Sequence, residues 1–458
     1  NSPFPIPNSQ FPIPNSPFPT KKMLGLTRYQ WIILLAAWLG WGFDIFDSVL
    51  LNFVSPNCVP TLLGLSIGSQ EAQAATFYWT GVLTTVLLLG WAIGGVMFGK
   101  LADRIGRTKT LLLTILLYSF GTTSCAFAPN IWILMLFRFI TSLGVGGEWA
   151  AGAAMVAEVM PEKRRVEAGA LLCTSAPLGA FLATCANFAI AGILFPDRPE
   201  ISWRYVFLCG LIPAALAAVL RLFVKEPEVW RENVGKFAPP RIRELFNSEN
   251  LAATISGLLL SLVALVTLYG CVSFIPIIST ELAESVALTQ GLDPTATQVL
   301  VEQWKAIASN CINLGSWIGT LLTVPLAKLF GRKVMFSIYF IFSSATLLTI
   351  FGLSLPPEIL IYSFFFIGIS VFGVFGSFSY YLPELFPTRL RATGSGFCYN
   401  AGRLVAAVTP FLVGYVVASG EDVLSTASLT IFCVGFIPLL GLAAMPWAIE
   451  TKGQVLAK

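Results

Sequence analysis

The sequence predicts an all-α membrane protein in which twelve transmembrane helices form two pseudo-symmetric six-helix bundles. Of the 458 residues, 56% are hydrophobic and only 11% are charged, whereas a soluble domain carries roughly 25% charged residues. Apolar runs of about 18 residues or more, long enough for a helix to cross a bilayer, recur along the whole chain. The short alternating segments of a membrane β-barrel do not occur in it, so a helical bundle is expected.

The expected helices follow one another with short polar connections. Their apolar runs lie near 29–54, 77–99, 109–127, 131–157, 166–195, 203–224, 252–279, 303–327, 334–353, 358–383, 392–418 and 426–448. A longer polar stretch with three prolines separates six runs from six. The opening residues repeat a proline-rich heptad that can form neither a helix nor a core, so a disordered extension is expected there. The predicted units are the extension 1–22, a first bundle 23–224, a linker 225–250, a second bundle 251–450 and a tail 451–458.

Basic residues alternate with acidic ones from loop to loop. Lys and Arg lie before the first run, between runs two and three, four and five, and eight and nine, and in the linker. The opposite loops carry acidic residues, among them Glu71, Asp197, Glu284, Asp293 and Asp422. By the positive-inside rule, this pattern predicts cytoplasmic N- and C-termini in an inner or plasma membrane. The net charge of +4 is therefore a signal of topology, and nucleic-acid binding is not expected.

Two motifs occur once in each half of the chain. GKLADRIGRTK begins at Gly99, and a weaker copy, LAKLFGRK, begins at Leu326. AEVMPEKRRVEAGA begins at Ala157, and its counterpart PELFPTRLRATGSG begins at Pro383. Both pairs are separated by about half the chain, which indicates an internal duplication. Such duplication in a membrane protein is typical of secondary transporters.

The repeated motifs carry residue types suited to a conformational gate. Gly106 allows a tight turn, and Asp103 can meet a helix N-terminus or an arginine. Arg104 and Arg107 offer forked donors to a carboxylate such as Glu158. An ordinary basic loop is the alternative, which the repeated spacing disfavours. The predicted gate residues are Gly99, Asp103, Arg104, Gly106, Arg107, Glu158, Glu384 and Arg391.

Charges within apolar runs are costly and therefore mark functional candidates. Asp44 and Asp47 lie three residues apart on one face of the first helix, and Arg138 lies in the fourth run. Because histidine is absent, proton chemistry has to use carboxylates. We expect an ion pair between Asp44 and Arg138 that proton binding releases; a static buried ion pair is the alternative. Glu148 is either a second protonation site or a structural partner of the loop arginines.

Arg403 is the main candidate for substrate binding. It lies near the middle of the eleventh run with no acidic residue close in sequence. A desolvated guanidinium favours an anion such as a substrate carboxylate; capping of backbone carbonyls is the alternative. Lys305 is interpreted as a lysine that extends to the membrane interface; attraction of anions near the outer mouth of its helix is the alternative. Further polar or aromatic candidates for the substrate site are Asn400, Tyr380, Tyr381, Gln303, Asn310 and Asn313.

These motifs resemble those of a known family of transporters. GKLADRIGRTK is similar to the signature loop of the major facilitator superfamily, and the sequence from Arg138 to Arg165 resembles its fourth-helix motif. PELFPTRLRATGSG and the IETKG segment near the end resemble elements of its sugar and organic-acid porters. The resemblance covers the chain after Met23. It implies two bundles that rock about a central site, latched at the cytoplasmic side by the Gly99 loop, and a weaker second latch because Lys328 replaces the aspartate.

The predicted function is proton-coupled symport of a small organic anion by alternating access. The expected partners are that anion, protons and the bilayer; the proton gradient replaces any cofactor or metal, and a monomer is expected. Alternatives are a sugar or polyol symporter, which the absence of a glutamine pair in the seventh run disfavours, and a proton-coupled drug exporter. Outside transport, a transporter-like nutrient receptor is the alternative. The sequence shows no nucleophile–base set or metal-ligand cluster, so an enzyme is not expected.

Overall fold

A computed structural model describes residues 26–105, 107–160, 164–212, 215, 241–387 and 390–453. Within these ranges, no side chain is described at residues 28, 99–100, 102–105, 107–108, 111, 147–155, 157–159, 165 and 392. The expected extension 1–22 and the first part of the linker therefore lie outside the described residues.

The first half of the chain contains six membrane helices, the fifth of which is broken. Thr27 caps the first helix through a capping box with Gln30, and Gly64 ends it with a φ of 72°, as left-handed C-terminal glycines do. The helices of this half are α1 (Arg28–Leu63), α2 (Gln70–Ile105), α3 (Arg107–Cys125), α4 (Ile131–Val159), the broken segment α5 (Arg165–Cys173), α6 (Ser175–Asn187) and η2 (Phe188–Leu194), and α7 (Pro199–Cys209).

The second half contains six further membrane helices, and four of them are interrupted. It opens with the short helix η3 (Ile242–Phe246) and ends with η6 (Met445–Trp447). The membrane helices between them are α10 (Leu251–Cys271) with η4 (Val272–Phe274) and α11 (Ile275–Gln290), α12 (Pro294–Phe330), α13 (Arg332–Gly352), α14 (Pro357–Ile367) with η5 (Gly368–Phe372) and α15 (Phe375–Glu384), α16 (Arg391–Ala406) with α17 (Val408–Ala418), and α18 (Val423–Val434) with α19 (Ile437–Ala443).

The predicted twelve-helix membrane architecture is confirmed. Among the described residues, nine helical segments are long and apolar enough to cross a membrane, and shorter apolar stretches lie in α3 and α4; α7 supplies the twelfth segment. Several helices extend beyond their apolar runs. In particular, α12 begins at Pro294, nine residues before the run predicted to start at 303.

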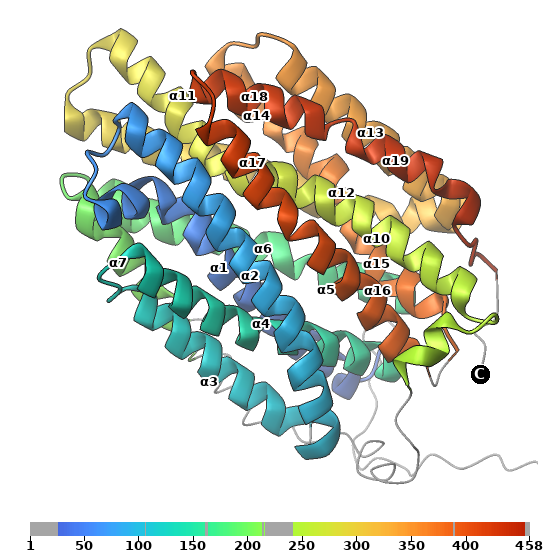
Figure 1. Ribbon diagram of the computed structural model, residues 1–458. Coiled ribbons are helices and arrows are strands. Elements are labelled where there is room, and N and C mark those ends of the chain that lie inside the picture. Colours follow the sequence, from blue (N-terminus) through green and yellow to red (C-terminus); the bar gives the residue numbers. More distant parts are fainter. Residues whose placement is uncertain are drawn as a thin grey trace, which may run out of the picture.

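The two halves pack side by side, with α2 and α17 in contact across them (Figure 1). A Cβ at Gly81 of α2 would lie 2.4 Å from the carbonyl oxygen of Pro410, and one at Gly414 of α17 would lie 2.5 Å from that of Phe77. Thr85 also donates to the carbonyl of Ala407 at 2.7 Å. Small residues thus let the two backbones touch, as is common between membrane helices.

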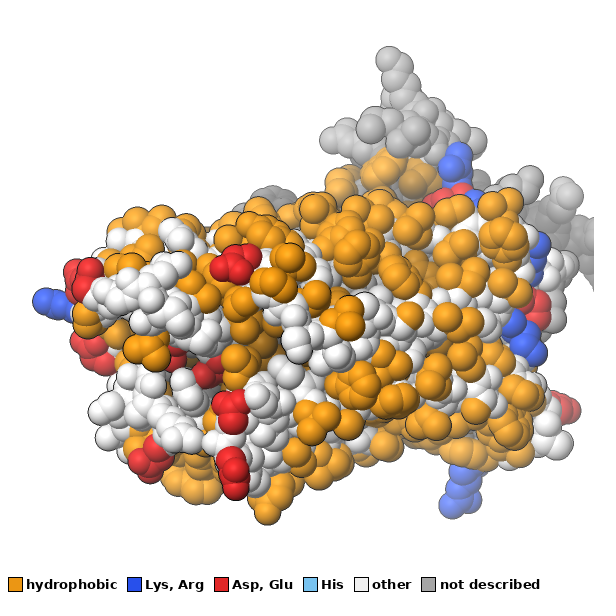
Figure 2. All heavy atoms as spheres, turned by 90° about the horizontal axis from the view of Figure 1, so that it is seen from above, with side chains coloured by type: hydrophobic (Ala, Val, Ile, Leu, Met, Phe, Trp, Pro, Cys, Tyr) orange, Lys and Arg blue, Asp and Glu red, His pale blue; other side chains and the backbone are white. Residues whose placement is uncertain are grey.

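The surface divides into a hydrophobic belt and two polar ends (Figure 2). In this view acidic side chains gather toward one end, and most of the visible Lys and Arg side chains lie toward the other. We name the end with the turns 64–69, 291–293 and 419–422 the acidic end. The end with Gly331 and the segment 448–453 is the basic end. This polarity matches the alternation of charged loops in the sequence.

Candidate functional site

Arg138 binds the backbone of α1 in the first half. Its Nη2 donates to the carbonyl of Ser48 at 2.9 Å, and its Nη1 donates to that of Asp47 at 3.4 Å. Among the described residues no ion pair joins Arg138 to Asp44, so the expected pair is wrong for this conformation. Counting inward from the ends of the apolar runs placed Arg138 level with Asp44, whereas helix packing places it about one turn further along α1.

Asp47, whose backbone carbonyl takes part in this arginine contact, also carries a buried carboxylate. It is 1% exposed, and among the described residues neither of its side-chain oxygens has a hydrogen-bond partner. A Cβ at Gly210 would lie 3.2 Å from Asp47 Oδ1 and 2.7 Å from Thr122, so the surroundings are tightly packed. Asp44 is also fully buried. A buried ionised carboxylate is costly unless it is paired or hydrogen-bonded, and both residues remain candidates for proton uptake and release.

Arg403 lies between the two halves, among aromatic rings. Its guanidinium carbon is 4.1 Å from the ring centre of Trp91 in α2 and 4.8 Å from that of Tyr399 in α16. Nη1 donates to Asn400 Oδ1 at 3.0 Å. Arg403 is 3% exposed, and its Nε has no hydrogen-bond partner within the ranges that the structure describes. In the described part of the chain it makes no ion pair, which agrees with the lack of an acidic neighbour in sequence.

Asn400 is the predicted substrate residue that the structure brings to Arg403. Besides accepting from Arg403, it donates to the carbonyl of Gly396 at 3.0 Å. Asn310 and Asn313 form a separate pair on α12, in which Asn313 donates to Asn310 at 3.3 Å. A role for this pair in binding stays a prediction.

Three other residues predicted to bind substrate lie elsewhere. Gln303 is exposed on α12, while both of its neighbours in sequence are buried, so its side chain points out of the bundle. The Tyr380 hydroxyl contacts Thr323 and Met335, and the Tyr381 hydroxyl contacts Ser256 and Ile449. All of these partners belong to the second half, so both hydroxyl groups are satisfied within it. A role for the two tyrosines in binding stays a prediction.

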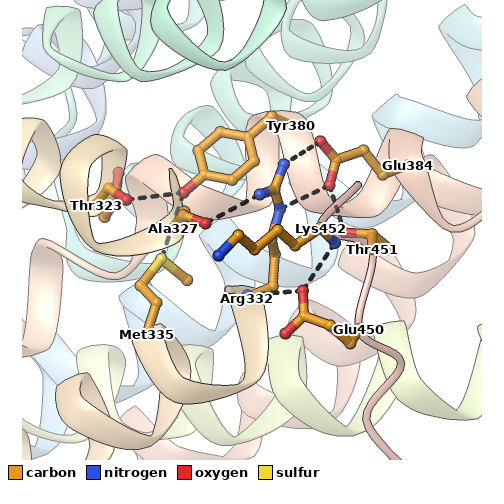
Figure 3. A network of polar contacts seen from close by, with 9 residues as sticks. All are labelled: Thr323, Ala327, Arg332, Met335, Tyr380, Glu384, Glu450, Thr451 and Lys452. Carbon is orange, nitrogen blue, oxygen red and sulfur yellow. Dashed lines mark hydrogen bonds and ion pairs between the residues drawn. The ribbon is translucent and has the colours of Figure 1, made fainter. Parts of the chain in front are cut away.

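The second copy of the loop motif forms an ordered polar network at the basic end (Figure 3). Arg332 donates Nη2 to Glu384 Oε1 at 2.8 Å and Nε to Glu384 Oε2 at 3.1 Å. Its Nη1 donates to the carbonyl of Ala327 at 3.0 Å, and the Tyr380 ring lies 5.7 Å from the guanidinium. Thr451 donates to the same Glu384 carboxylate at 2.5 Å. A bidentate pair of this kind fixes geometry as well as charge.

Glu450 of the IETKG segment caps α13. Its carboxylate accepts from the backbone N–H groups of Arg332 at 2.9 Å and Lys333 at 3.0 Å, donors that a helix N-terminus leaves free. The N–H of Lys452 donates to it at 2.8 Å. Partial burial acts to raise the pKa of Glu450, but these backbone donors outweigh it and the net shift is downward. The stabilisation is therefore present above the ordinary pKa of 4.5 and is lost as pH falls through the lower folded value.

Arg391, the other gate residue of the second half, joins α16 to α15. Its Nε donates to the carbonyl of Pro383 at 3.0 Å. Lys328, at the position that corresponds to Asp103 in the first copy, forms an ion pair with the first half: its Nζ lies 2.5 Å from Glu167 Oε1 in α5. The two side chains are 47% and 34% exposed, and an exposed pair contributes at most about 1 kcal/mol.

The first copy of the gate lies outside the described side chains, as does Glu148. This applies to Gly99, Asp103, Arg104, Gly106, Arg107 and Glu158. By the repeat, Arg332 corresponds to Arg107, 225 residues earlier, and Glu384 corresponds to Glu158, 226 residues earlier. The Arg332–Glu384 contact thus shows, in the second copy, the type of pair that we expect in the first.

One group of buried charges was missed by the sequence analysis. Glu302 and Lys305 are both 0% exposed and form an ion pair of 2.6 Å, so the interfacial position expected for Lys305 is wrong. The Glu302 carboxylate also accepts from Asn57 at 3.2 Å, Asn187 at 2.6 Å and Gln298 at 3.0 Å. The spacing of Glu302 and Lys305, one helical turn apart, could have indicated the pair, but the apolar run that predicted this helix begins only at 303.

A bundle of membrane helices whose halves enclose a buried ion pair, Glu302–Lys305, and a buried arginine, Arg403, is typical of a membrane transport protein. The chain belongs to the Major Facilitator Superfamily, whose sequence profile matches residues 31–410. The predicted family is therefore confirmed.

Relatives include transporters of small organic acids. A protein from Cupriavidus pinatubonensis described as a probable 4-methylmuconolactone transporter is 30% identical, over 91% of this chain and 90% of its own. The gentisate transporter of Corynebacterium glutamicum is 27% identical, over 84% of this chain and 81% of its own. The niacin transporter NiaP of Acinetobacter baylyi is 26% identical, over 94% and 97%. Among solved structures, a D-xylose–proton symporter superposes with a TM-score of 0.70 at 19% identity, over 93% of this chain and 100% of its own; this likeness concerns the fold.

Proposed function

We propose that the protein carries a small organic anion across the membrane by alternating access. Arg403 carries this proposal: it is a buried guanidinium between the halves that makes no ion pair in the part of the chain that the structure describes. A substrate carboxylate would supply the missing anion. The flanking rings of Trp91 and Tyr399 suit a flat, conjugated acid. The cargoes in the names of the relatives, gentisate and niacin, support the same class.

We also propose that transport is symport with protons, so that the proton gradient drives it without a cofactor. Asp44 and Asp47 are buried in α1 beside the backbone contact of Arg138. Neutralising either acid changes the charge next to a fixed guanidinium and so biases the equilibrium between conformations. The alternation of charged loops supports a cytoplasmic basic end, with both termini on that side.

The anion proposal is tested by ligand-induced stabilisation of the purified protein. A ligand that binds the folded state raises the unfolding temperature, by an amount that grows with the ratio of its concentration to its Kd. Nicotinate and benzoate are expected to raise it, and their uncharged amides, nicotinamide and benzamide, are not. Xylose serves as a neutral sugar control. Equal stabilisation by acid and amide, or stabilisation by xylose alone, would contradict the anion assignment.

Proton coupling is tested with Asp44→Asn and Asp47→Asn in proteoliposomes. An amide mimics the protonated acid but cannot release a proton. If one of the two aspartates couples protons to transport, its asparagine variant should show pH-driven concentrative uptake reduced at least tenfold, while substrate counterflow is retained. Counterflow needs the conformational cycle but no net proton movement, and it therefore serves as the control for folding. If both variants still concentrate substrate in response to a pH gradient, neither aspartate couples protons.

A further inference from the structure

Four side-chain donors converge on a single carboxylate near the acidic end. Lys305 Nζ lies 2.6 Å from Glu302, and amide groups of Asn57, Asn187 and Gln298 donate to it at 3.2, 2.6 and 3.0 Å. All five side chains belong to residues that are at most 9% exposed. The charge of a carboxylate with this many donors is well compensated inside a protein. The cluster is therefore a specific structural feature rather than a chance contact.

The cluster crosses the boundary between the halves. Glu302, Lys305 and Gln298 lie on α12 of the second half, whereas Asn57 lies on α1 and Asn187 ends α6 in the first half. Lys305 also donates across the boundary, to the carbonyl of Phe53 in α1 at 3.1 Å. Nearer the surface, Gln73 donates to Glu284 at 3.1 Å and Thr295 donates to Asp197 at 2.7 Å, so the halves meet along this end.

We propose that Glu302 and Lys305 form a lock that closes the acidic end of the transport path. In this lock the pair holds Asn57, Asn187 and the Phe53 carbonyl, and it releases them each time that end opens. The inference rests on the alternating access proposed above, but it does not depend on the identity of the cargo.

The contacts of the lock fall into two groups, those within α12 and those to the first half, and this explains why the lock can open. The bonds from Gln298 and Lys305 to Glu302 lie within α12 and move with that helix. Of the contacts made by this cluster, only the three to α1 and α6 have to break when the end opens. After they break, Glu302 and Lys305 still neutralise each other, so opening exposes a paired charge and leaves no isolated ion in a low-dielectric site. A lone buried charge in the same place would lack this property.

The lock is distinct from the residues proposed for binding and coupling. Arg403 contacts α2 and α16 residues, and Arg138 contacts α1 at Asp47 and Ser48. At the basic end, the described contact between charged side chains of opposite halves is the exposed Lys328–Glu167 pair. The buried lock therefore favours the state that is closed at the acidic end.

The test measures distances between spin labels on the purified full-length protein without substrate. Labels on cysteines at Ser66 and Ser354 span the acidic end, and labels at Lys109 and Arg243 span the basic end; all four positions are exposed. The four native cysteines that are not buried, Cys185, Cys209, Cys311 and Cys433, are replaced by alanine. Glu302→Gln is expected to reduce the short-distance population across the acidic end by at least half, with no lengthening across the basic end.

A matched control and a second variant complete the test. Glu358→Gln changes an exposed glutamate in the first turn of α14 and should leave both distance distributions unchanged. If Glu302→Gln does not fold, the double variant Asn57→Ala with Asn187→Ala removes two cross-boundary donors and keeps the ion pair; a smaller shift in the same direction is expected. Unchanged distances, or equal lengthening at both ends, would overturn the lock. Because no substrate is added, a failure of the anion proposal leaves this result interpretable.

Discussion

Replacing Arg403 with alanine is expected to raise the apparent KM for a carboxylate substrate on the order of 100-fold. A hydrogen bond to a charged group contributes about 1.5–3 kcal/mol, and loss of a forked contact therefore amounts to about 3 kcal/mol, which corresponds to roughly 100-fold in affinity. The measurement is the concentration dependence of initial uptake in proteoliposomes, or of binding where uptake becomes too slow.

A conservative variant separates charge from shape at this position. Arg403→Lys keeps the positive charge but loses the planar fork and the stacking on Trp91 and Tyr399, so an intermediate loss is expected. Binding of the uncharged amide of the same acid should change much less in either variant. Equal losses for the acid and its amide would show that Arg403 supports the structure and does not recognise an anion.

Replacing Arg332 with alanine is expected to lower the free energy of unfolding by about 3–5 kcal/mol, far more than loss of the exposed Lys328–Glu167 pair. The reason is that the Glu384 carboxylate, part of a largely buried ion pair, is left without its arginine. The side chains of Arg332 and Glu384 are only 9% and 13% exposed. The variant also loses the bond to the Ala327 carbonyl. The measurement is the thermal unfolding temperature of the purified protein.

Two further variants calibrate that result. Lys328→Gln removes an exposed ion pair and should change stability by no more than about 1 kcal/mol. The double variant Arg332→Ala with Glu384→Ala should be less destabilised than the two single losses combined, because no unpaired charge remains. A change for Arg332→Ala as small as that for Lys328→Gln would mean that the Arg332–Glu384 contact contributes little.

The sequence could predict the helices and the family because both depend on local information. Apolar length, the side of the basic residues and a repeated motif each follow from short stretches of chain. The contact between Arg332 and Glu384 in the second copy of the motif was not predicted, although the repeat relates it to the pair expected between Arg107 and Glu158. The level of a buried charge along the neighbouring helix was harder to predict. Arg138 contacts α1 at the carbonyls of Asp47 and Ser48 and not at Asp44, because packing sets the positions of the helices relative to one another.

The cross-boundary contacts could not be predicted, because they join residues far apart in sequence. Trp91 meets Arg403, and Asn57 meets Glu302 across 245 positions. Periodicity indicates that a residue is buried but does not identify its partner. Glu302 was missed for a further reason: it lies just before an apolar run, and a helix longer than its run carries polar residues into the interior.

The cap on α13 has a consequence for the synthesis of the protein. Arg332 and Lys333 present their backbone N–H groups to Glu450, which follows them by 118 and 117 residues. At about 5–20 residues per second, a ribosome needs roughly 6–24 s to reach that glutamate. During this interval the start of α13 lacks its final acceptors. The second bundle therefore completes its basic end only after the segment that carries Glu450 has been made.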